Sequence, residues 1–139
     1  PEGRGTDIPA ALESLTHVQR KRAVTFLVSD FRDEGFDKAL AVAGRRHDLI
    51  AVRIGDVREH ELPALGLLEL EDPETGERVV VNSSNPGFRR AFQEVGVKRR
   101  EELDAVLRRS KVDVIDIETG QPYVKPLMRF FQDRLRRRR

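Results

Sequence analysis

The chain has 139 residues and a mass of 15.9 kDa, which is the size of one ordinary domain. Its 26 basic and 24 acidic residues leave a net charge of +2, too small for a dedicated nucleic-acid binder. It contains no cysteine, so disulfides, thiol catalysis and zinc–thiolate sites are excluded. No apolar run in the sequence approaches the roughly 18–20 residues needed to cross a bilayer.

The N-terminal part of the chain alternates between helical and strand patterns. Thr6 or Asp7 can cap a helix, because Pro9 suits the first helical turn. A continuous apolar run then predicts a strand buried on both faces, as in a parallel sheet. In chain order the pattern predicts a helix over 9–17, a strand over 23–29, a helix over 35–47 and a strand over 49–54.

The rest of the chain begins with a different pattern, in which an acidic Pro/Gly turn separates two short apolar runs. Such a turn predicts a hairpin. The following elements are a helix from Pro86 to about residue 107, which could break near Gly96, a strand over 112–117 and a helix over 123–135. The predicted fold class is α/β: a partial doubly wound, mostly parallel sheet, with an antiparallel hairpin of 67–71 and 78–82.

Two groups are expected at the carboxyl edge of this sheet, where open α/β folds bind their ligands. Asp30 directly follows the first predicted strand, and Thr6 lies in a small-residue loop before the first helix. Hydroxyl and carboxylate oxygens suit Mg²⁺ or Mn²⁺. From the residues alone, however, a turn or a helix cap is the commoner use of both side chains.

Other polar features have structural interpretations. His47 and His60 have no motif partners and are expected at a helix end or on the surface. The acidic hairpin turn lacks the ligand spacing of a calcium loop. The basic C-terminus, with Arg134 and residues 136–139, suits the end of a helix and could also attract anionic partners. No aromatic platform for stacking bases accompanies it, so no specific nucleic acid is expected as a partner.

Several segments together resemble one bacterial family, the domain of unknown function fifty-eight, which is similar to von Willebrand factor A domains. The resemblance covers nearly the whole chain in the same order of elements. It rests on GTDIPAAL at 5–12, FLVSDF at 26–31, GF at 35–36, RRHDLIAVRI at 45–54, LLELEDPETG at 67–76 and the helix within 122–131. It implies that residues 1–139 are a single-domain fragment, the C-terminal part of a von Willebrand factor A-like domain.

The resemblance also implies a metal-ion-dependent adhesion site made by three loops. Its second loop supplies a threonine, matched by Thr6, and its third loop supplies an aspartate, matched by Asp30. The first loop, Asp-x-Ser-x-Ser, does not occur in these residues. Mg²⁺ or Mn²⁺ is therefore expected in the intact parent domain, with weak or no binding by this chain.

The leading functional interpretation is a non-enzymatic protein-interaction domain, in which a partner carboxylate completes the metal site. The family resemblance implies a MoxR-type AAA+ ATPase as the partner. One alternative is a metal-dependent hydrolase that uses Asp30 and Asp56, and another is binding of anionic polymers through the arginine-rich tail.

The remaining expectations concern compartment and association. The absence of cysteine is compatible with a cytoplasmic domain, and segments upstream of Pro1 could tether it to a membrane. Only five residues precede Thr6, so the strand that would cover one edge of residues 23–28 is not expected within this sequence. An open apolar edge is a template for pairing, and we therefore expect a homodimer of this chain.

Overall fold

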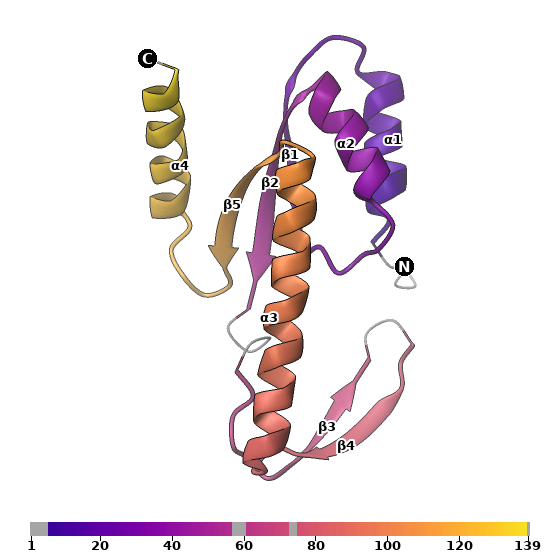
Figure 1. Cartoon of the computed structure of the whole chain (residues 1–139), viewed down its shortest axis with the longest axis vertical. Coiled ribbons are helices and arrows are strands. Elements are labelled where there is room, and N and C mark those ends of the chain that lie inside the picture. Colours follow the sequence, from indigo (N-terminus) through magenta and orange to yellow (C-terminus); the bar gives the residue numbers. More distant parts are fainter. Residues whose placement is uncertain (1–5, 57–60, 73–74, 139) are drawn as a thin grey trace.

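The computed structural model describes residues 6–56, 61–72 and 75–138 (Figure 1). Its elements follow the order predicted from the sequence. They are α1 (Ile8–Val18), β1 (Val24–Ser29), α2 (Asp37–Arg46), β2 (Asp48–Gly55), β3 (Leu67–Glu71), β4 (Arg78–Asn82), α3 (Pro86–Arg109), β5 (Asp113–Glu118) and α4 (Val124–Arg137).

The main sheet has the strand order β1-β2-β5, and both pairings are parallel. Phe26 lies opposite Ile50, and Val52 lies opposite Ile115. Strands β3 and β4 form a separate antiparallel pair in which Leu67 faces Asn82. The predicted α/β class is therefore confirmed, including the hairpin outside the parallel sheet.

Local capping explains where the helices begin. The Asp7 side chain accepts a hydrogen bond from the Ala10 N–H at the start of α1. Asn85 does the same for the first turn of α3, with Pro86 at the first helical position. Helix α3 then continues for 24 residues without a break at Gly96.

Apolar side chains cover both faces of the sheet, and helices on opposite sides bury them. One face packs beneath α1, α2 and α3 in a core that includes Leu12, Leu40, Leu49, Ala51, Leu107 and Val112. The other face packs beneath α4, where Ile50, Val52 and Ile115 contact Leu127 and Phe130. Figure 1 shows α4 on the far side of the sheet from α1 and α2.

Strand β1 corrects one expectation from the sequence. It is not buried on both faces, because its residues alternate between exposed and half-buried. Val24, Phe26 and Val28 share the face that α4 covers, but α4 lies mainly over β2 and β5. Phe26 reaches only the edge of α4, where its ring meets Phe131 at 6.4 Å, and remains 45% exposed. Only β2, the central strand, has the deep burial that the continuous apolar runs predicted.

The contact between α2 and the end of α3 gives a first testable prediction. A Cβ added at Gly44 would lie 2.7 Å from the Ser110 carbonyl oxygen, closer than such atoms approach. We expect Gly44→Ala to lower the free energy of unfolding by about 2 kcal/mol, despite the better helix propensity of alanine. Urea denaturation measures the change. Gly55→Ala is the matched control, because its Cβ would meet nothing within 4 Å. Equal stability of the two variants would contradict the predicted clash.

Candidate functional site

The loop after β1 and the segment before α1 are joined by a hydrogen bond. The Ile8 N–H donates to Asp33 Oδ2 at 2.7 Å. Ile8 is two residues from Thr6, and Asp33 is three residues from Asp30, so this bond tethers the two segments that carry the predicted metal ligands. The side chains of Thr6 and Asp30 are both exposed at this end of the molecule.

The turn that carries Asp30 is fixed by its neighbours. Phe31 has a left-handed backbone conformation with φ of 56°, which costs a non-glycine residue about 1 kcal/mol or more. Its buried ring offsets this strain by packing edge-to-face on Phe36, with ring centroids 5.9 Å apart. The Phe31 N–H also donates to Ser29 Oγ at 3.0 Å. Asp30 therefore occupies a defined position immediately beyond the end of β1.

The chain's own residues do not make a complete cage for a divalent cation at this place. Thr6 and Asp30 offer two side-chain oxygen ligands, whereas Mg²⁺ takes six. Asp30 Oδ2 also lies 3.6 Å from Arg32 Nε, which partly neutralises the carboxylate. No group of three or more histidine or acidic residues that could hold a metal occurs in the part of the chain that the structure describes.

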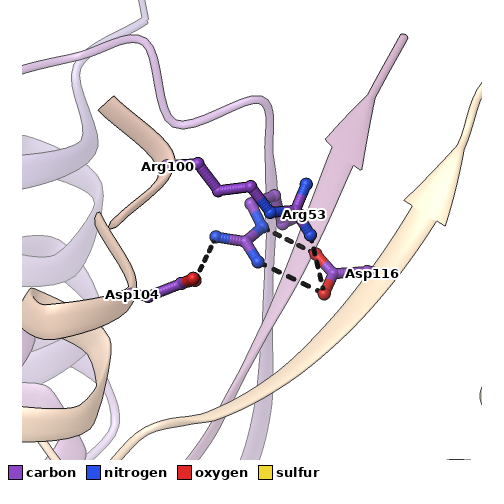
Figure 2. A network of polar contacts seen from close by, with 4 residues as sticks. All are labelled: Arg53, Arg100, Asp104 and Asp116. Atoms are coloured by element: carbon purple, nitrogen blue, oxygen red, sulfur yellow. Dashed lines mark hydrogen bonds and ion pairs between the residues drawn. The ribbon is translucent and has the colours of Figure 1, made fainter. Parts of the chain in front are cut away.

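A second polar constellation, which the sequence interpretation missed, lies between the sheet and α3. Arg53 is in β2, and its side chain is only 9% exposed. Its Nε and Nη2 donate to the two carboxylate oxygens of Asp116 in β5, at 2.6 and 3.2 Å. Its Nη1 donates to Asp104 in α3 at 2.6 Å, and Arg100 Nη2 lies 3.4 Å from Asp116 (Figure 2).

These contacts favour the charged form of Arg53 despite its burial. Burial alone would lower its pKa, but the hydrogen bonds and charges of Asp116 and Asp104 outweigh burial, so the pKa is raised. Arg53 therefore stays a cation that joins α3 to β2 and β5. The sequence signal was an arginine inside an otherwise apolar strand, which requires a buried partner.

The structure can be compared with the positions predicted for the histidines and the hairpin turn. His47 is the C-cap of α2, so the predicted helix-end position is confirmed, and its side chain is buried with 1% exposure. Its Nδ1 accepts a hydrogen bond from the Ala23 N–H at 3.4 Å. His60 and residues 73–74 of the acidic turn lie outside the described residues.

Part of the basic tail has a structural role. Arg134 forms an ion pair with Asp48 in β2 and lies 3.6 Å from Asp113 in β5. Its guanidinium also lies over the Phe130 ring, 5.7 Å from the centroid. Arg138 approaches the same Asp48 at 3.9 Å. These contacts hold the C-terminal half of α4 against the start of the sheet.

The fold and this arrangement define an α/β domain with a parallel sheet and a polar carboxyl edge. The family described as "Protein of unknown function DUF58" matches residues 1–102, and the chain belongs to this family. Among the described residues, no helix is long and apolar enough to cross a membrane.

Curated relatives come from mycobacteria. The uncharacterized protein MAV169 of Mycobacterium avium is 24% identical over 139 residues, which cover 98% of this chain and 80% of that protein. The uncharacterized proteins Mb1516 of Mycobacterium bovis and MT1527 of Mycobacterium tuberculosis are each 27% identical over 98% of this chain. The matched region is 43% of their length, so the chain spans less than half of these two relatives.

One solved structure has weak similarity to this chain in fold and in sequence. The conserved hypothetical protein BatB from Bacteroides thetaiotaomicron has a TM-score of 0.41 and 18% sequence identity. The match covers 86% of this chain and 55% of that protein.

Proposed function

We propose that the chain is part of a non-enzymatic protein-interaction domain, which docks a partner through a metal ion in the intact parent protein. The observation that supports the proposal is the hydrogen bond from the Ile8 N–H to Asp33, which ties the Thr6 segment to the Asp30 loop. Oxygen ligands from the two loops suit Mg²⁺ or Mn²⁺, and the parent supplies the remaining ligands. With Thr6 and Asp30 among its ligands, such an ion would leave room for a carboxylate of the partner to bind.

The proposed partner is a MoxR-type AAA+ ATPase. The basis is the family resemblance, which implies this partner class, and the site chemistry fits a protein carboxylate as the docking group. The partner is proposed by analogy with the family, whereas the metal is proposed from the oxygen ligands that Thr6 and Asp30 offer.

Calorimetric titration of the intact parent with Mg²⁺ tests the site. We expect Asp30→Ala to weaken Mg²⁺ binding at least about tenfold, because an anionic oxygen ligand is removed. Glu94→Ala is the matched control, since Glu94 is an exposed acidic residue on α3. Equal Mg²⁺ affinity of the wild type and Asp30→Ala would remove Asp30 from the site.

A second measurement tests docking and the absence of catalysis. Binding of the ATPase to the parent is measured at constant Mg²⁺, so that the nucleotide chemistry of the ATPase is unchanged. We expect Asp30→Ala to weaken this binding and Glu94→Ala to leave it unchanged. Phosphatase activity that is present in the wild type and lost in Asp30→Ala would overturn the non-enzymatic proposal in favour of a hydrolase.

A further inference from the structure

A groove of about 540 Å³ lies between strand β5 and helix α4, away from the Thr6 and Asp30 loops. We call it the α4–β5 groove. Its apolar lining comes from Val114, Ile115, Pro126 and Phe130. Its charged lining consists of Asp113, Asp116, Lys125, Arg129, Asp133, Arg134 and Arg137.

One wall of the groove is the outer edge of the parallel sheet. Strand β5 pairs with β2 on one side, and within the described residues no strand pairs with its other side. The backbone groups that point outward along residues 113–117 make no hydrogen bond to another described segment. Such an edge accepts an added strand through main-chain hydrogen bonds.

The charges that remain after internal pairing are mostly positive. Asp113 lies 3.6 Å from Arg134, and Asp116 is bound by Arg53 at 2.6 Å, so each of the two carboxylates that line the groove has a cationic partner. On the α4 wall, Lys125, Arg129 and Arg137 form no ion pair with a described residue. Asp133 is the acidic residue left among them, so the wall favours an acidic ligand.

The spacing of these side chains matches an extended segment. Residues 125, 129, 133 and 137 recur every four positions, which places them roughly 6 Å apart along the helix axis. Same-face residues of a strand, two positions apart, are separated by roughly 6.6 Å. A seven-residue strand along β5 can therefore place one side chain opposite each of these four residues. Three of those side chains should be acidic, and the one opposite Asp133 should be basic.

The same lining disfavours a nucleic acid. Asp133 interrupts the row of cations on the α4 wall of the groove. A continuous phosphate backbone would meet this carboxylate, whereas a peptide can place a neutral or basic residue opposite it. A bound helix would leave the outward backbone groups of β5 unpaired.

We propose that the α4–β5 groove binds an extended acidic segment of a partner protein, which adds a strand to β5 and pairs its acidic side chains with Lys125, Arg129 and Arg137. This interaction needs no metal and uses neither Thr6 nor Asp30. It is therefore independent of the docking proposed above, and it is measured in the presence of EDTA.

The test uses labelled seven-residue peptides and fluorescence anisotropy with the 139-residue chain. The probes are Glu-Thr-Lys-Thr-Glu-Thr-Glu and its reverse, which suit a strand parallel or antiparallel to β5. We expect one of the two peptide sequences to bind saturably. Arg129→Glu should weaken this binding at least about tenfold, because it reverses a charge that contacts the peptide. Lys98→Glu is the matched control on α3 and should change the affinity less than about twofold.

A charge exchange separates recognition from misfolding. Asp133→Lys should raise the affinity for Glu-Thr-Glu-Thr-Glu-Thr-Glu about tenfold and lower the affinity for the lysine-containing probe, a gain that misfolding cannot produce. N-methylation of alternate peptide amides should abolish binding, because it removes the main-chain donors. The proposal would be overturned if the methylated peptide bound equally well or if no probe bound saturably. It would also be overturned if a twelve-nucleotide single-stranded DNA bound more tightly than the peptides and lost affinity in Arg129→Glu.

Discussion

Arg53→Met is expected to lower the free energy of unfolding by about 2 kcal/mol, because it removes charge-assisted hydrogen bonds to two half-exposed carboxylates. Asp116 and Asp104 each accept a hydrogen bond of 2.6 Å from Arg53, and they come from β5 and α3. The substitution therefore removes the polar link between the sheet and this helix at the same time. Methionine retains most of the apolar volume, so the loss reports mainly on charge and hydrogen bonding.

The stabilisation by Arg53 should be independent of pH across the physiological range. The raised pKa of Arg53 means that its contribution is fully present below the ordinary pKa of arginine. The contribution is lost only as the pH rises through the still higher pKa of the folded state. The difference in stability between the wild type and Arg53→Met, measured by urea denaturation, should thus be the same at pH 7 and pH 9.

Arg100→Met provides the control for this network. Arg100 lies 3.4 Å from the same Asp116 carboxylate, but its side chain is 45% exposed. Exposed ion pairs contribute about 0–1 kcal/mol, so the expected loss is within that range. If Arg100→Met destabilised the chain as much as Arg53→Met, burial would not be the reason for the larger effect.

The predictions from sequence succeeded where the information is local. Alternation, caps and turn residues act over a few positions, and they predicted the helices, the three parallel strands and the hairpin in the correct order. The exposure of Phe26 was predicted wrongly, because it depends on whether α4 reaches β1. An apolar run specifies a strand, but it does not specify which helix covers each face.

The polar sites were less predictable because their partners are distant in sequence. Arg53 and Asp116 are separated by 63 positions, and only the β2–β5 register places them opposite one another. The tether between Ile8 and Asp33 spans 25 positions and has no sequence motif. Thr6 and Asp30 were singled out through a family resemblance, and their role as ligands remains a prediction.

The structure also identifies the surface on which association of this chain is expected. Val24 and Val28 are each 58% exposed on the α4 side of the sheet, because α4 does not extend over them. Helix α4 adds an exposed apolar stripe of Val124, Met128, Phe131 and Leu135. The Phe26–Phe131 contact joins the two groups into one surface, which we call the β1–α4 apolar face. Large exposed apolar surfaces of this kind usually mark an interaction site.

We expect the 139-residue chain to form a two-fold dimer at micromolar concentration through the β1–α4 apolar face. Within the described residues β1 pairs only with β2, so its other edge can pair with the same edge of a second copy. The double substitution Val24→Lys and Val28→Lys should give a monomer in sedimentation velocity, because lysines would oppose each other across the two-fold axis. Val79→Lys with Val80→Lys is the matched control on β4, where both valines are also exposed, and it should leave the dimer intact. A wild-type chain that stays monomeric, or a dimer lost only in the β4 variant, would show that the β1–α4 apolar face does not drive association.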